Sequence, residues 1–201
     1  KLEFLREIKN PERIKRLGVP ISLGLEGYLF PQTYFFTRPV TADQIIETMI
    51  AEGEKTWTTE YSKRATELKM TKHEVLTLAS IIEKESGVVS EQPTISSVFH
   101  NRLALGMKLQ SDPTVIYGIK DYNGNITKED LQTPTPFNTY TNFGLPPGPI
   151  CSPGATSIKA ALYPANSNFL FFVADGHGSH VFAATLAEHN ENVAKYQLHR
   201  E

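Results

Sequence analysis

The clearest helical pattern in the chain lies between residues 71 and 87. Apolar residues at positions 75, 78, 79 and 82 are spaced i, i+3, i+4 and i+7, so they share one face of an α-helix. Thr71-Lys-His-Glu marks its beginning, because the Thr71 and Glu74 side chains can each bind the other residue's backbone amide in a capping box. Gly87 is a residue type that commonly ends helices. The pattern therefore predicts a buried helix that starts after Thr71 and ends by Gly87.

Weaker helical patterns occupy much of the remaining chain. Residues 1–17 suit a short helix that Pro11 interrupts. Thr41 can cap a helix through Ile50, and we expect this helical region to extend over residues 60–69. Asp112 is predicted to cap another helix, with Pro113 in its first position. Further helices are expected at residues 95–106, at residues 157–162 and from residue 186 to the end of the chain.

Two parts of the chain favour extended structure instead. Residues 23–36 are rich in aromatic residues, and Pro31 limits them to an edge strand or a bent strand. Residues 169–174 and 180–184 are short β-rich runs on either side of a Gly-rich turn, which predicts a β-hairpin. Helices combined with one small sheet indicate the α+β class.

A long Pro/Gly-rich segment separates the helices from this hairpin. Seven of the 13 prolines lie between Pro134 and Pro164, so central strands and long helices are excluded there. Asn138-Thr-Tyr, Phe143 and Ile150 argue for an ordered loop, because disordered linkers are poor in such residues. Long ordered loops in compact domains commonly carry function.

Composition narrows the classes of protein to consider. A length of 201 residues allows one domain, or one domain with part of a neighbour. Twenty Lys and Arg residues against 22 Asp and Glu residues leave a net charge of −2, which gives no support to binding of nucleic acid or of an anionic membrane. Cys151 is the single cysteine, so an intrachain disulfide and any site that needs two thiolates are excluded.

No segment of the sequence is apolar over the roughly 20 residues that cross a bilayer. The chain begins at Lys1 without a charged and apolar leader, so we expect a fragment or a processed form.

Two glutamates near the end of the best-defined helix are candidates for acid–base chemistry. At about 100° per residue, Glu83 and Glu85 both fall within the apolar arc of the helix, towards its two borders. Apolar neighbours and the negative end of the helix dipole both raise the pKa of a carboxyl group, as the general acid of a glycosidase requires. The periodicity does not choose between Glu83 and Glu85, and two solvated border residues would show the same pattern.

Many motifs along the chain resemble one known family. They are Leu25-Glu-Gly-Tyr-Leu-Phe-Pro-Gln-Thr-Tyr, Leu78-Ala-Ser-Ile-Ile-Glu-Lys-Glu-Ser, Ser97-Val-Phe-His-Asn-Arg-Leu, Leu109-Gln-Ser-Asp-Pro-Thr-Val-Ile-Tyr-Gly, Asn138-Thr-Tyr, Gly144-Leu-Pro-Pro-Gly-Pro-Ile, Ser152-Pro-Gly-Ala, Ser157-Ile-Lys-Ala-Ala, Phe172-Val-Ala-Asp-Gly and Gly178-Ser-His-Val-Phe. Together they resemble the endolytic murein transglycosylases of the YceG-like family, in order, from about residue 25 to residue 196.

The resemblance implies a catalytic residue and a reaction. In that family the acid is the second glutamate of the Glu-x-Glu pair, which corresponds to Glu85, and Glu85-Ser86 also resembles the Glu-Ser pair of soluble lytic transglycosylases. The implied reaction cleaves the β-1,4 bond between N-acetylmuramic acid and N-acetylglucosamine in peptidoglycan. Glu85 would protonate the glycosidic oxygen and then accept the proton of the muramyl 6-hydroxyl as the 1,6-anhydro ring closes. Neither a metal nor a cofactor is implied.

Several loop residues are candidates for substrate binding. Gln110, Asp112, Asn138, Thr139 and Tyr140 supply the amide, carboxylate, hydroxyl and aromatic groups that sugars bind. They could equally cap a helix or satisfy the loop backbone.

The resemblance also implies an organisation and a location. The expected fold is a helical lytic-transglycosylase-like catalytic core with a small β-hairpin and a long Pro/Gly-rich ordered loop. Residues 1–22 would be the tail of a preceding LysM-like module or a connector, and residues 23–201 the catalytic domain. The full-length protein would be anchored by a single membrane segment absent from this chain, with its catalytic part outside the cytoplasm. Glycan strands, and potentially peptidoglycan synthases and division or elongation proteins, are the expected partners.

Three other functions compete with this prediction. A metal amidase would need a spaced set of metal ligands, but His177 and His180 lie on a predicted turn and no His-Glu-x-x-His pattern occurs. An aminodeoxychorismate lyase, an older label for this family, would need a lysine that binds pyridoxal phosphate and a phosphate-binding loop. A glycan-binding scaffold that positions synthases would need no catalytic acid.

Overall fold

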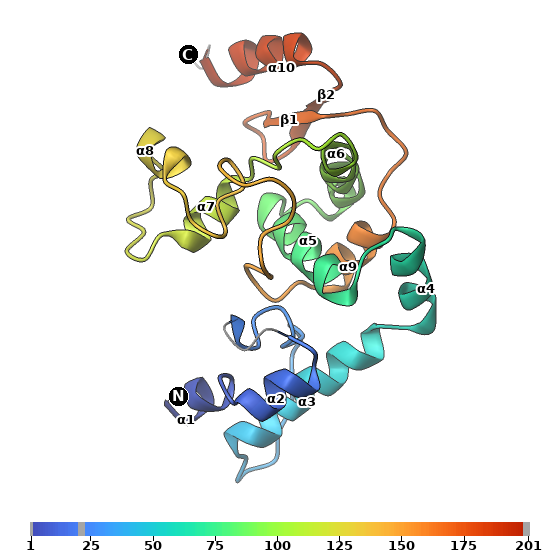
Figure 1. Cartoon of the computed structure of the whole chain (residues 1–201), viewed down its shortest axis with the longest axis vertical. Coiled ribbons are helices and arrows are strands. Elements are labelled where there is room, and N and C mark those ends of the chain that lie inside the picture. The colour runs from blue at the N-terminus through green and yellow to red at the C-terminus, as the bar shows by residue number, and fades with distance from the viewer. Residues whose placement is uncertain (1, 20–22, 199–201) are drawn as a thin grey trace.

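The computed structural model describes residues 2–19 and 23–198. Within them, helices dominate and one small sheet is present, so the α+β class is confirmed (Figure 1). In chain order the helices are α1 (Leu2–Glu7), α2 (Pro11–Arg16), α3 (Ala42–Thr56), α4 (Thr59–Glu67), α5 (Lys72–Glu85), η2 (Val89–Glu91), α6 (Gln92–Ala104), α7 (Asp112–Gly118), α8 (Lys128–Gln132), α9 (Ala155–Leu162), α10 (Leu186–Val193) and the π-helical turn η3 (Ala194–Leu198). The strands are β1 (Phe171–Ala174) and β2 (His180–Ala183).

Helix α5 forms the centre of the molecule. Every residue from Val75 to Ile82 is buried, and the helix packs against α6 and α9. The predicted capping box is confirmed, because the Thr71 backbone amide donates to Glu74 Oε2 at 2.7 Å and the Glu74 amide donates to Thr71 Oγ1 at 3.2 Å. Ser86 leaves the helix in an extended conformation, so α5 ends at Glu85, two residues before Gly87, and without a left-handed glycine.

The helices after Thr41 and after Gln110 differ from the predicted ones. The helical region after Thr41 is two helices, because the chain leaves the helical conformation at Trp57 and Thr58 caps α4 by accepting from the Tyr61 amide. The residue that caps α7 is Ser111, and Asp112 is the first helical residue. This shift frees the Asp112 carboxylate from a capping role.

The prediction of a strand at residues 23–36 is wrong. In the described part of the chain only β1 and β2 pair, in antiparallel register with Phe171 opposite Ala183. The aromatic character of this segment serves packing instead: Tyr28 is 8 % exposed and its hydroxyl lies 2.9 Å from His73 Nδ1. Residues 24–28 form turns and residues 30–36 are neither helix nor strand, so backbone amides here bind other acceptors, and the Phe30 amide donates to the Met49 carbonyl of α3.

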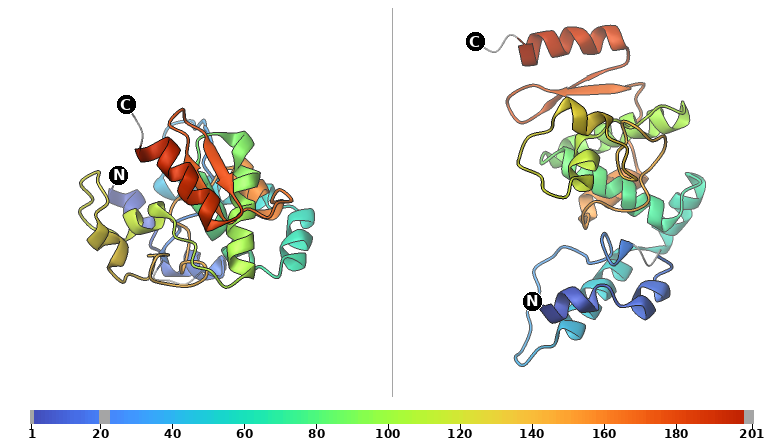
Figure 2. Two further views of the ribbon diagram at one scale, coloured as in Figure 1. Left: turned by 90° about the horizontal axis from the view of Figure 1, so that it is seen from above. Right: turned by 60° about the vertical axis from the view of Figure 1, so that its left-hand side comes forward.

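The segment from residue 133 to residue 154 contains neither helix nor strand and links α8 to α9. It lies against α5, where the Ile150 amide donates to the buried Ser80 hydroxyl at 2.9 Å. The predicted β-hairpin is confirmed as β1 and β2, and α10 packs on it at the end of the molecule opposite α1 and α2 (Figure 2). The predicted C-terminal helix is present as α10 and η3, and its last residues, 199–201, lie outside the described part of the chain.

The N-terminal helices share the hydrophobic core of the rest. Ile14 of α2 is fully buried in the same apolar cluster as Ile46 of α3 and Leu78 of α5. In this region the guanidinium of the buried Arg13 contacts Glu7, Asp43 and Glu47. Residues 1 and 20–22 of the predicted N-terminal module lie outside the described ranges. Among the described helices, none combines the length and apolar character needed to span a membrane.

Candidate active site

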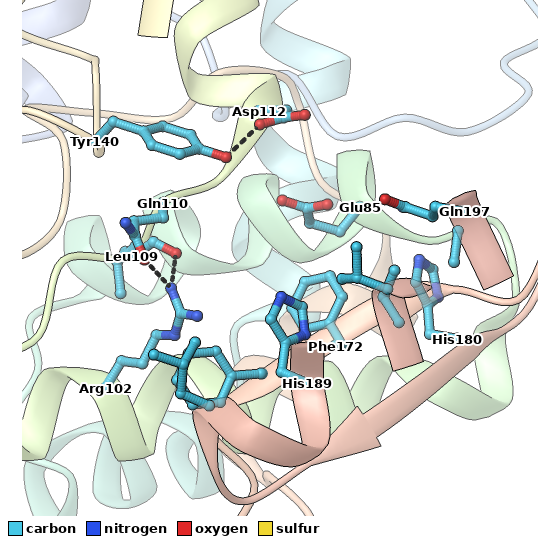
Figure 3. A pocket seen from close by; sticks show the side chains of 15 residues that line it. Glu85, Arg102, Leu109, Gln110, Asp112, Tyr140, Phe172, His180, His189 and Gln197 are labelled. Carbon is cyan, nitrogen blue, oxygen red and sulfur yellow. Dashed lines mark hydrogen bonds between the residues drawn. The ribbon is translucent and has the colours of Figure 1, made fainter. Parts of the chain in front are cut away.

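A pocket of about 500 Å³ lies between the end of α5 and the C-terminal hairpin (Figure 3). One wall consists of Gln110, Asp112 and Tyr140, and the opposite wall comes from β1, β2, α10 and η3. The complete lining is Glu85, Arg102, Leu109, Gln110, Asp112, Tyr140, Phe171, Phe172, Val173, Ala174, His180, Leu186, His189, Val193 and Gln197.

Glu85 presents its carboxylate to this pocket from the last position of α5. The Ser111 hydroxyl donates to Glu85 Oε1 at 2.5 Å. Burial raises the pKa of Glu85 to about 7, with a further upward contribution from the Asp112 charge, while the Ser111 hydrogen bond and the Arg102 charge act in the opposite direction. A carboxyl group with this pKa can be protonated or ionised near neutral pH, so it can serve as an acid and then as a base.

Glu83 lies on a different side of α5 and has a different role. Its Oε2 accepts hydrogen bonds from the Gly154 amide at 3.1 Å and from the Ser157 hydroxyl. Gly154 is the N-cap residue of α9, so Glu83 ties the central helix to the start of α9, where a negative charge is favourable. The structure therefore separates the two glutamates that periodicity left equivalent.

Asp112 and Tyr140 form a pair on the opposite side of the pocket from the hairpin. The Tyr140 hydroxyl donates to Asp112 Oδ1 at 2.6 Å, and burial raises the pKa of Tyr140. Gln110 lies beside them, and its side-chain oxygen accepts from Arg102 at 3.2 Å. Three of the predicted substrate-binding residues, Gln110, Asp112 and Tyr140, therefore lie together with Glu85 in one pocket.

The other two predicted substrate-binding residues, Asn138 and Thr139, are buried beneath the pocket wall and do not line it. Asn138 is 0 % exposed, and its side-chain amide donates to three backbone carbonyls, the closest being Thr133 at 2.8 Å. Thr139 Oγ1 accepts from the Ser111 amide at 3.0 Å, and the Thr139 carbonyl accepts from the Gln110 amide at 3.1 Å. Both residues hold the backbone that carries the pocket residues.

Gln110 has a left-handed backbone conformation, with φ at 52°. Only glycine adopts this region without steric cost, so the two hydrogen bonds from residues 110 and 111 to Thr139 must offset it. This turn directs the Ser111 side chain towards Glu85, which explains how a loop can position a hydroxyl on the catalytic candidate.

The predicted site did not include several of the pocket residues, among them Arg102, Phe172, His180 and His189, although the first three of these lie in the quoted motifs. Arg102 is 8 % exposed and donates to the carbonyls of Leu109, at 2.8 Å, and Leu170, at 2.6 Å, so it joins the two walls. His180 lies with its Nδ1 atom 2.9 Å from Glu91 Oε2, which fixes its ring against the hairpin. The other two are His189, whose ring stacks on that of Phe171, and Phe172.

Within residues 2–19 and 23–198, no group of three or more His, Cys, Asp or Glu side chains is placed to hold a metal ion.

The fold and the pocket together define a class of protein. A half-buried carboxylic acid with a near-neutral pKa, in a pocket with hydrogen-bonding groups and aromatic rings, is typical of acid–base sites that act on glycans. The model of the YceG-like family matches residues 3–195, and the chain belongs to this family.

Known relatives support the same assignment. The chain is 40% identical over 197 residues to a protein of Bacillus subtilis (strain 168) named endolytic murein transglycosylase, with 98% of this chain and 53% of the relative covered. A protein of the same name from Streptococcus pneumoniae serotype 2 is 36% identical over 178 residues, covering 86% of this chain and 32% of the relative. The chain thus spans about half or less of the length of these relatives.

A solved structure provides a comparison of the fold. The crystal structure of a yceG-like protein from Listeria monocytogenes matches with a TM-score of 0.82 and 40% sequence identity, over 94% of this chain and 66% of that chain.

Proposed function

We propose that this chain is the catalytic part of an endolytic murein transglycosylase, with Glu85 as the general acid and then the general base. It would cleave the β-1,4 bond between N-acetylmuramic acid and N-acetylglucosamine and leave 1,6-anhydro ends. Its helical core would then be of the lytic-transglycosylase type, with the Pro/Gly-rich segment forming part of the glycan groove. The names of the Bacillus and Streptococcus relatives support this activity.

The main support for the proposal is the position and the raised pKa of the Glu85 carboxyl group. Its carboxyl group faces the pocket and has a pKa of about 7, chiefly because it is buried. At neutral pH a large fraction is protonated and can donate to the glycosidic oxygen, and the resulting carboxylate can accept the proton of the 6-hydroxyl. The substrate supplies the nucleophile, so a single carboxylate is sufficient and no water is consumed.

Asp112 supports a second candidate function. It is another carboxylate in the same pocket, and paired carboxylates are the machinery of glycoside hydrolases. In a hydrolase, Asp112 would activate a water molecule or act as the nucleophile. We favour the transglycosylase because the Asp112 carboxylate already accepts a hydrogen bond from Tyr140. The two reactions give different products, since a hydrolase leaves reducing ends that are heavier by one water than 1,6-anhydro ends.

The test is digestion of purified peptidoglycan strands with the parent protein and with Glu85→Gln, followed by mass spectrometry of the new ends. We expect 1,6-anhydro ends from the parent and a loss of at least about a thousandfold in rate for Glu85→Gln, because the amide cannot donate an acidic proton. Glu83→Gln is the matched control, since its amide oxygen can still accept at the start of α9 and its rate should stay near that of the parent.

Each outcome selects one function. Reducing ends in place of anhydro ends would establish the hydrolase and assign a direct role to Asp112. Binding of strands without any new ends, in both the parent and Glu85→Gln, would establish the glycan-binding scaffold. An undiminished rate for Glu85→Gln would refute the role of Glu85. Bound pyridoxal phosphate, visible as absorbance of the purified protein, would favour the aminodeoxychorismate lyase.

Further proposals follow from membership of the family. We assign direct sugar contacts to Gln110, Asp112 and Tyr140, and backbone positioning to Asn138 and Thr139. Residues 1–22 would connect to a LysM-like module, and the full-length protein would be membrane-anchored with this part on the extracytoplasmic side. Synthases and division or elongation proteins would be its protein partners.

A further inference from the structure

A second hollow, of about 560 Å³, adjoins the pocket that contains Glu85. It is lined by Lys108, Lys128, Leu131, Gln132, Tyr140 and Thr141, and we refer to it as the lysine groove. Tyr140 lines both hollows. The chain connects them as well, because Lys108 immediately precedes Leu109 and Gln110 of the Glu85 pocket. The two hollows therefore meet at Tyr140.

Two of the residues that line the lysine groove carry a positive charge. No carboxylate is among its lining residues, and within the described residues neither Lys108 nor Lys128 forms an ion pair. The Lys108 ammonium group lies 5.1 Å from the centre of the Phe143 ring, which is 70 % exposed. Most other described lysines, Lys9 and Lys63 among them, also form no ion pair, so what distinguishes the groove is that two lysines line one hollow. An anionic ligand would find two ammonium groups without a competing internal carboxylate.

The chemistry of peptidoglycan supplies such a ligand at the right place. N-acetylmuramic acid carries a peptide on the lactyl group at C3, on the same sugar ring whose C1 atom reacts beside Glu85. This peptide must leave the Glu85 pocket within a few ångströms of the cleaved bond. Stem peptides carry free carboxylates, and a carboxylate is the partner that an exposed ammonium group binds.

We propose that the lysine groove binds the carboxylates of the stem peptide on the muramic acid residue at the cleavage site. The proposal rests on the proposed function, because it takes the substrate to be a peptidoglycan strand. It assigns a substrate preference to the protein: strands that carry peptides are bound more tightly than strands from which the peptides have been removed. Lys108 and Lys128 are then binding residues that act on affinity, with no part in proton transfer.

The test compares two forms of the same uncrosslinked glycan strands, one with stem peptides and one from which an amidase has removed them by hydrolysis, so that each muramic acid keeps only its lactyl carboxylate. The variant is Lys108→Ala/Lys128→Ala, and Lys9→Ala/Lys63→Ala is the matched control, because it removes two exposed lysines outside the groove. We expect the variant to raise KM for peptide-bearing strands by about five- to tenfold, with kcat unchanged, and to leave KM for stripped strands unchanged. Lys108→Glu/Lys128→Glu should raise KM for the peptide-bearing strands further.

Salt provides an independent measure of the same contact. Raising the NaCl concentration should weaken binding of peptide-bearing strands by the parent protein and have little effect on the alanine variant, because ions screen exposed charge pairs. Thermal unfolding should show the same Tm for the parent and for both double variants.

Several results would overturn the proposal. An equal rise in KM for both kinds of strand would show that the lysines contact the sugar chain or the fold, and an unchanged KM for both would show that they contact nothing. Failure of the proposed function can be distinguished from failure of the lysine-groove proposal. Binding of the two kinds of strand to the Glu85→Gln variant requires no turnover, so the lysine groove is tested even if the parent makes no anhydro ends. Equal affinity for both kinds of strand in that binding assay would also refute the proposal that the lysine groove binds the stem peptide.

Discussion

Replacement of Ser111 by alanine would remove the hydroxyl that donates to Glu85 Oε1 at 2.5 Å. This hydrogen bond favours the ionised carboxylate and lowers its pKa, against the larger effect of burial. Ser111 is 1 % exposed, so water cannot readily take the place of its hydroxyl. The substitution deletes a single oxygen atom and leaves the backbone bonds of residues 110 and 111 to Thr139 in place.

The size of the effect follows from the strength of the bond. A hydrogen bond to a charged group contributes about 1.5–3 kcal/mol, and about 1.36 kcal/mol corresponds to one pKa unit. Part of this is offset, because the Ser111 hydroxyl can also bind the protonated form of Glu85. We therefore expect the pKa of Glu85 to rise by about one unit above its value of about 7 in the parent.

The direction of the change in the pKa of Glu85 can be measured from the pH dependence of activity. In the proposed mechanism cleavage requires protonated Glu85, so activity would be present below its pKa and lost as the pH rises through it. The assay is the pH dependence of kcat/KM for the formation of 1,6-anhydro ends, which reports the pKa of the free enzyme. Ser111→Ala should move the alkaline limb upward by about one pH unit, while Ser90→Ala, at an exposed position, should not move it. An alkaline limb that stays in place or moves downward would refute the role assigned to Ser111.

Three further predictions concern stability. Glu85→Gln should raise Tm more at pH 8 than at pH 5. Folding raises the pKa of Glu85, so the parent loses stability as the pH increases from about 4.5 through about 7. Equal shifts in Tm at the two pH values would contradict this prediction. Asn138→Ala should cost about 2–4 kcal/mol of unfolding free energy, measured by urea denaturation, because three carbonyls lose their donor. His180→Ala should lower Tm more than His177→Ala does, because it leaves the largely buried Glu91 carboxylate without its ring partner, whereas His177 is exposed.

The elements whose signals are local could be predicted from the amino-acid sequence. The capping box at Thr71 and the apolar spacing after it depend on residues within one or two helical turns, and α5 forms where they predict it. The β-hairpin is equally local, since a Gly-rich turn joins its two strands. The strand predicted at residues 23–36 fails for the complementary reason: a strand requires a partner, and no local pattern reveals whether one is available.

The tertiary structure decided which polar groups share a pocket. Helical periodicity left Glu83 and Glu85 equivalent, and only the position of α9 gives Glu83 its partners, while residues 110–112 meet Glu85. Asn138 and Thr139 carry groups suited to sugars, yet their burial shows that they hold the wall on which Tyr140 is presented. The pKa of a carboxyl group depends on its burial and on charges from distant parts of the chain, so a site of this kind exists only once the chain has folded.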